Sequence, residues 1–81
     1  MIDEVRSVLR DSLQLAERAN ELQADSGLLG ELPEMDSMAV VIILTALEDR
    51  YGFIVDDDEV SAETFETLGS LTQFVEEKMD A

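Results

Sequence analysis

The fold is decided by the stretch Asp36-Ser37-Met38-Ala39-Val40-Val41-Ile42-Ile43-Leu44-Thr45-Ala46-Leu47-Glu48-Asp49-Arg50-Tyr51-Gly52. Its side chains from position 38 to position 44 are all apolar, which is typical of a helix in the centre of a fold. The same run, rich in β-branched residues, would also suit a buried strand. Better helix formers follow from position 45 to position 50, and Gly52 can end a helix. We therefore expect a helix over about residues 37–50.

Ser37 stands where a loop becomes this helix. A hydroxyl at that place is exposed and faces the positive end of the helix dipole, where an attached anionic group is favoured. Asp36 and Ser37 are also both common N-cap residues, so capping alone would explain the pair. Ser37 is a candidate attachment site, and simple capping is the alternative.

An amphipathic helix is expected before this stretch, over about residues 2–20. Ile2, Val5, Leu9, Leu13 and Ala16 form one apolar stripe at helical spacing. Residues 21–36 then form a long connection with turn signals at Gly27 and Gly30. We expect its leucines to pack onto the helices and hold it down: Leu22, Leu28, Leu29 and Leu32.

An acidic run, residues 56–59, follows the central helix and favours a short helix over about 57–62. Asp56 and Glu59 have the spacing of a capping pair. A calcium loop is not supported, because the alternating ligands, central glycine and closing glutamate are missing. Thr67 is placed to cap a last helix, in which Gly69 would allow close packing. The expected core is Val5, Leu9, Leu13, Val40, Leu44, Leu47, Leu68, Leu71 and Val75.

The composition excludes several classes of function. The chain has 81 residues, enough for a single domain over 1–81, and contains no cysteine and no histidine. A disulfide, a thiolate metal site and a serine–histidine triad are therefore excluded, and no metal site is expected. Twenty acidic residues against five basic ones give a net charge of −15, which repels nucleic acid and attracts basic partners. With no signal peptide or membrane-spanning segment recognised, we expect a cytoplasmic monomer that does not insert into membranes.

The order of these pieces resembles the acyl carrier protein family. Asp36-Ser37-Met38 is similar to the Asp-Ser-Leu at the start of that family's second helix, with Met38 for the usual leucine. Residues 46–52, 53–59 and 67–71 resemble the end of the second helix, the apolar segment with its acidic turn, and the opening of the last helix. The resemblance covers about residues 30–78 and implies an all-α, four-helix bundle with three long helices and one short.

The resemblance implies a carrier and not an enzyme. A free-standing acyl carrier protein holds an acyl group as a thioester on a 4'-phosphopantetheine arm, here attached to Ser37. Asp36 would keep the junction in shape and help the transferase, and Met38 would begin the apolar interior behind the arm. The implied partners are a phosphopantetheinyl transferase, an acyl-loading ligase or acyltransferase, and downstream enzymes that consume the acyl group.

One departure from the family concerns partner binding. The family's second helix carries acidic residues on the outer face of its first two turns, where this chain has Ala39 and Ile42. Acid follows only at Glu48 and Asp49, so partners are expected to use these two residues and an apolar patch of Met38, Val41 and Ile42. This favours a specialised pathway. The alternatives are an aminoacyl or peptidyl carrier, and an unmodified acidic helical interaction protein.

Overall fold

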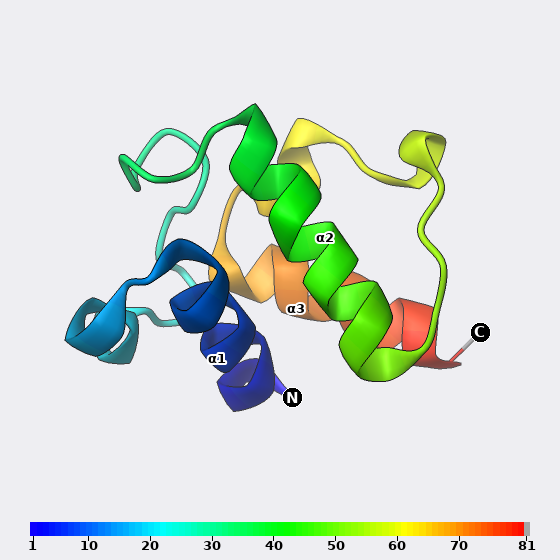
Figure 1. Ribbon diagram of the computed structural model, residues 1–81, viewed down its shortest axis with the longest axis horizontal. Coiled ribbons are helices and arrows are strands. Elements are labelled where there is room, and N and C mark those ends of the chain that lie inside the picture. Colours follow the sequence, from blue (N-terminus) through cyan, green and yellow to red (C-terminus); the bar gives the residue numbers. More distant parts are fainter. Residues whose placement is uncertain (81) are drawn as a thin grey trace.

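The computed structural model is built from helices and describes residues 1–80, apart from the side chain of Asp57 (Figure 1). In chain order the elements are α1 (Ile2–Leu13), the 3₁₀ helix η1 (Ala16–Glu21), α2 (Ser37–Tyr51), two further 3₁₀ helices η2 (Asp57–Glu59) and η3 (Ala62–Phe65), and α3 (Leu68–Asp80). The prediction of an all-α bundle is confirmed. The short helix expected near residues 57–62 is divided between η2 and η3.

The first helix is shorter than the sequence predicted. α1 ends at Leu13 because Gln14 adopts a left-handed conformation with φ of 54°, and its N–H caps the carbonyl of Arg10. Leu15 lies six residues after Leu9, about 240° around a continuous helix, and would point away from the core. The break turns Leu15 inward, where it is 2% exposed. Ala16, which the stripe placed in the core, is instead exposed with φ of 54°.

α2 crosses the bundle and packs against α1 (Figure 1). Its buried positions are Ala39, Ile43 and Leu47, which are four residues apart and so lie along one face. Val40 and Leu44 were expected in the core but are only partly buried, as is Leu13 of α1. An apolar sequence all round the helix gave no sign of which face turns inward, so the prediction missed Ile43, which is fully buried.

The remaining core comes from all parts of the chain. Six of the nine expected core residues are buried: Val5, Leu9, Leu47, Leu68, Leu71 and Val75. The list of expected core residues did not include the buried residues Val8, Leu15, Ala19, Met35, Ala39, Ile43 and Phe65, nor Leu22 and Leu28, which were expected to pack onto the helices from the connection. Several of these lie in the connections, so the loops supply a large part of the interior.

The long connection is fixed by backbone pairing with the segment that leads into α3. Leu28 N–H donates to Glu66 O at 2.9 Å, Leu29 N–H donates to Phe65 O at 3.0 Å, and Leu68 N–H donates to Ser26 O at 3.1 Å. Leu22 and Leu28 are buried and Leu32 is half-buried, as expected, but Leu29 is exposed. Leu29 takes part through its backbone, and its side chain is left on the solvent side.

Gly69 allows this pairing to continue into α3. Its N–H donates to Ala24 O at 2.8 Å, and a Cβ at this position would lie 2.8 Å from the same oxygen. The expected close packing at Gly69 is therefore present, but it is against the loop and not against another helix. Thr67 caps α3 as predicted, since its Oγ1 accepts from Ser70 N–H at 3.0 Å.

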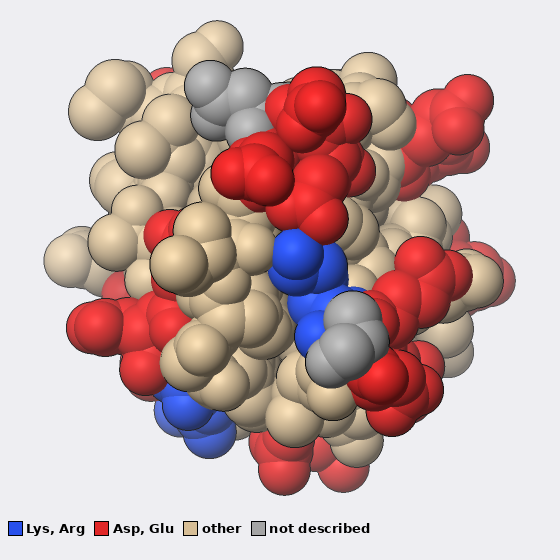
Figure 2. All heavy atoms as spheres, turned by 90° about the vertical axis from the view of Figure 1, so that its right-hand side faces the viewer, with Lys and Arg blue, Asp and Glu red and all other residues tan. Residues whose placement is uncertain are grey.

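The acidic turn is held by two hydrogen bonds to Glu59, one from the backbone within the turn and one from the side chain of Lys78 in α3. Glu59 accepts from Asp56 N–H at 2.7 Å, which confirms half of the predicted capping pair, and from Lys78 Nζ at 2.8 Å. These contacts lower the pKa of Glu59, the Asp56 N–H first and Lys78 second. On the face drawn in Figure 2, acidic side chains dominate the charged surface and the few basic ones lie among them.

Truncation of Leu47 and of Leu44 tests the orientation of α2. We expect Leu47→Ala to lower the free energy of unfolding by about 2–5 kcal/mol, because it opens a cavity at a fully buried site. Leu44→Ala should cost clearly less, since that side chain is only partly buried. Urea denaturation of both variants measures the difference. Equal costs, or a larger cost at Leu44, would contradict this orientation of the helix.

Candidate functional site

Asp36 forms the N-cap of α2. Its backbone is extended, with φ of −121° and ψ of −173°, and its Oδ1 accepts from Ala39 N–H at 2.8 Å. Its carbonyl accepts the first helical hydrogen bond, from Val40 N–H at 3.1 Å. The cap fixes where the helix begins, and Ser37 is therefore its first residue.

Ser37 presents its hydroxyl to solvent at the positive end of α2. The residue is exposed, and within the described part of the chain no hydrogen bond ties its hydroxyl to another group. The first N–H groups of a helix have no partner inside the helix and point outward. A phosphate on the Ser37 oxygen would lie beside these groups and near the positive end of the dipole. The residues present therefore fit a covalently attached phosphodiester.

Met38 does not begin the apolar interior, which corrects the expectation from sequence. Its side chain is 66% exposed. Met38 comes one residue before the inward-facing Ala39 and therefore points about 100° away from it around the helix. The methionine that lies beneath the junction is Met35, which is 7% exposed. Ser37 therefore lies between two flexible methionine side chains near the helix start, Met35, which is buried, and Met38, which is exposed.

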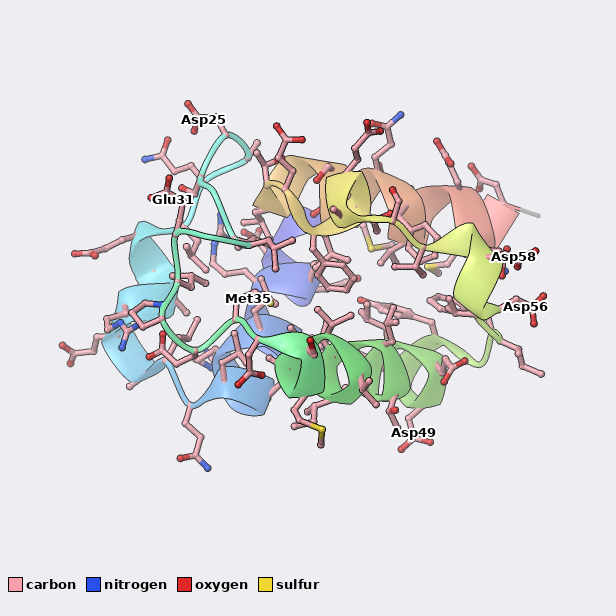
Figure 3. The ribbon with its side chains drawn as sticks, turned by 90° about the horizontal axis from the view of Figure 1, so that it is seen from above. Asp25, Glu31, Met35, Asp49, Asp56 and Asp58 are labelled. Carbon is pink, nitrogen blue, oxygen red and sulfur yellow. The ribbon has the colours of Figure 1, made fainter. Side chains whose placement is uncertain are left out.

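The outer face of α2 is apolar near Ser37 and acidic farther along. Val41 is 56% exposed and Ile42 is 45% exposed, so they form a surface patch with Met38 as expected. Asp49 is exposed on the same face and points away from the bundle (Figure 3). Glu48 is half-buried and accepts a hydrogen bond from Val55 N–H at 2.8 Å, so its carboxylate holds the segment that follows the helix.

An ion pair supports the loop that leads to Ser37. Arg18 of η1 contacts the Glu34 carboxylate through both terminal guanidinium nitrogens, with Nη2 at 2.7 Å from Oε1 and Nη1 at 2.6 Å from Oε2. The hydrogen bond from Arg18 lowers the pKa of Glu34 and raises the pKa of Arg18 itself. The sequence gave no signal for this pair, because its members are 16 residues apart in irregular structure.

The candidate site lies on the exposed surface of α2. Two surface hollows of about 350 and 380 Å³ are lined by residues of the α1–η1 turn and by residues of η2 and α3, and Asp36, Ser37 and Met38 line neither. Among the described residues, no group of acidic side chains is arranged to hold a metal ion. In the same part of the chain, no helix is long and apolar enough to cross a membrane.

Comparisons with known proteins agree with this geometry. The family described as "phosphopantetheine attachment site" matches residues 3–75. The chain belongs to this family of carrier domains. A solution NMR structure of a holo acyl carrier protein from Nitrosomonas europaea has 57% sequence identity and a TM-score of 0.91, and the match covers 99% of this chain and 96% of that chain. A search of curated proteins gave no match.

Family membership explains why the site lacks catalytic machinery. The chain is an acyl carrier protein with a phosphopantetheine attachment domain, and it is not an enzyme. Its cofactor is covalently bound 4'-phosphopantetheine. A carrier needs an accessible residue for its arm and a stable surface around that residue.

Removal of the Asp36 carboxylate tests the cap. We expect Asp36→Ala to lower the free energy of unfolding by about 0.5–2 kcal/mol, as is usual for lost N-caps, while Asp36→Asn retains most of the stability. Asp25→Ala is the control, because Asp25 is an exposed loop residue (Figure 3). Urea denaturation measures all three, and an equal effect at positions 25 and 36 would contradict the assigned cap.

Proposed function

We propose that Ser37 is the residue that carries the 4'-phosphopantetheine arm, and that the chain delivers an acyl group to partner enzymes in a specialised pathway. The observation that carries the proposal is the exposed Ser37 hydroxyl at the capped N-terminus of α2. When attached, the arm supplies the terminal thiol, and hence the thioester chemistry, that a chain without cysteine lacks.

The residues around Ser37 have separate roles in this proposal. Asp36 holds the helix start, so the serine oxygen is presented at one place to a phosphopantetheinyl transferase. The free N–H groups of the first turn stabilise the phosphodiester once it is formed. The chain has no histidine, and the Asp36 carboxylate is engaged in the cap, so we assign removal of the serine proton to the transferase.

Other serines fit this role less well. Ser70 lies in α3 and donates to Thr64 O at 3.0 Å, and Ser26 accepts from Gln23 N–H at 2.8 Å in a turn. Neither stands at the start of an α-helix after an aspartate cap. Ser37 combines the exposed hydroxyl, the preceding cap and the helix N-terminus.

Intact mass spectrometry tests the attachment. Wild-type protein incubated with coenzyme A and a panel of phosphopantetheinyl transferases should gain the mass of one arm, and Ser37→Ala should gain none. Ser26→Ala is the matched control and should be modified like the wild type. If no transferase modifies the wild type, or if Ser37→Ala is still modified, the assignment of Ser37 is wrong.

The cargo is proposed to be an acyl group, with an amino acid as the alternative. The similarity to a holo acyl carrier protein supports the first. Loading of the holo protein by acyl-activating and aminoacyl-activating ligases distinguishes them, with acylation as the expected result. The acyl-loading ligase or acyltransferase and the enzymes that consume the acyl group are the proposed later partners.

Partners are proposed to dock on the outer face of α2. Ile42 lies five residues after Ser37, about 7.5 Å along the helix, so an enzyme that reaches the serine also covers the apolar patch. Asp49 lies another 10 Å or so farther, where a basic residue of the partner could pair with it. Glu48 is already bonded to Val55, and its contact with a partner stays a prediction. The lack of acid in the two turns of α2 after Ser37 supports partners different from those of a general carrier.

Ile42→Glu tests this surface. The transferase that modifies the wild type most efficiently should lose about tenfold or more in kcat/KM, because a charge would be buried in an apolar contact. Met79→Glu is the control, since Met79 is 47% exposed in α3. It should change kcat/KM by about twofold at most. Equal losses in the two variants would indicate a general charge effect and contradict docking on the patch.

A further inference from the structure

Arg18 and Glu34 form a bidentate ion pair that joins η1 to the loop before α2. Arg18 lies in η1, and Glu34 lies in the connection to α2, with both nitrogen–oxygen distances below 2.8 Å. A planar guanidinium on a carboxylate in this arrangement fixes orientation as well as distance. The pair therefore constrains the direction of the loop, which a single flexible contact would not do.

The pair lies on the outer side of the last loop residues before the attachment serine. Glu34 is followed by buried Met35, whose N–H donates to Leu32 O at 3.0 Å, and then by Asp36, whose N–H donates to Glu34 O at 3.1 Å. Met35 anchors this segment from the inside, and Arg18 anchors it from the outside. Asp36 and Ser37 follow directly from a segment held on both sides.

The earlier part of the loop is held by the half-buried side chain of Leu32, which packs against the core, and has few polar contacts. Glu31 and Leu32 bond only to Leu28 O within the loop, and Gly30 has φ of 88° with open space around it. Leu29, Gly30, Glu31 and Pro33 are exposed. Among the described residues, the contact of Arg18 with Glu34 is the polar contact that another element makes with the loop between Leu29 and Asp36.

The 3₁₀ helix that carries Arg18 is anchored in the core by buried side chains. Its neighbour Ala19 is 1% exposed, and Leu15 and Leu22 on either side of η1 are 2% and 7% exposed. The left-handed residues Gln14 and Ala16 turn the chain so that η1 faces the loop. Such conformations are unfavourable for residues with a Cβ, so the fold accepts strain to place η1 here.

We propose that Arg18 is a positioning residue for the attachment serine, acting through Glu34. The inference rests on the proposed function of Ser37. By holding residues 31–36 in one conformation, the ion pair prepares the surface that a transferase covers when it reaches Ser37. Without it the loop has to be ordered during docking, which weakens binding but leaves the chemical step unchanged.

Steady-state kinetics of arm transfer test the inference. Arg18→Gln and Glu34→Gln should each raise KM for the carrier about three- to tenfold, with kcat within about twofold of the wild type. The two variants change the net charge in opposite directions, so a general charge effect would move KM in opposite directions. The charge-swapped double variant, Arg18→Glu with Glu34→Arg, should recover part of the loss.

Arg10→Gln is the matched control. Arg10 is exposed on α1 and pairs with its neighbour Asp11, so its loss changes the charge as Arg18→Gln does without touching the loop. KM should stay within about twofold of the wild type. An unchanged KM in Arg18→Gln and Glu34→Gln, or an equal rise in Arg10→Gln, overturns the inference.

Amide hydrogen exchange on the unmodified protein separates this inference from the proposed function. Arg18→Gln and Glu34→Gln should speed hydrogen exchange at the backbone amides of residues 31–36, apart from Pro33, which has no amide hydrogen. Exchange at the amides of α3 should stay unchanged. This readout does not require arm transfer. If wild type is never modified but the loop loosens as expected, the function of Ser37 fails while the structural role of Arg18 stands. If the loop amides do not change, the inference is wrong.

Discussion

The backbone pairing between residues 24–29 and residues 65–69 is the constraint on which the rest of the structure depends. A long connection without regular helix would otherwise leave the start of α2 without a fixed position. The pairing draws Leu28 into the core, and Gly69 makes the close approach to Ala24 possible. With one end of the connection fixed there and Met35 buried near the other, the chain arrives at Asp36 in a defined direction.

The functional site is a consequence of this arrangement and needs few residues of its own. One carboxylate caps α2, one hydroxyl is left free, and the helix supplies the N–H groups that favour an anion. This simplicity is consistent with a carrier, since the chemistry of loading and unloading belongs to other enzymes. In the proposed function, the chain contributes a fixed point of attachment at Ser37 and an exposed surface of α2 that partners contact.

Charge and apolar surface are divided between different parts of the molecule. A net charge of −15 gives long-range attraction to basic partners, yet the two turns of α2 after Ser37 have no acidic side chain. The residues that set the long-range electrostatic field therefore differ from the apolar residues that are exposed beside Ser37. The two acids at the end of α2 also differ in role. The Glu48 carboxylate accepts a hydrogen bond from Val55 N–H, whereas Asp49 points away from the bundle (Figure 3).

The sequence by itself determined the helical class, the extent of α2, the Asp36 cap and the serine at its start, because these depend on local propensity, capping chemistry and a motif of neighbouring residues. It could not tell which side of an apolar helix is buried, so the expected core left out Ile43, and Met38, expected to begin the apolar interior, lies on the surface. It also could not foresee that α1 stops at Gln14, or that Arg18 meets Glu34. Those features arise from packing between segments far apart in the chain, and only the tertiary structure brings them together.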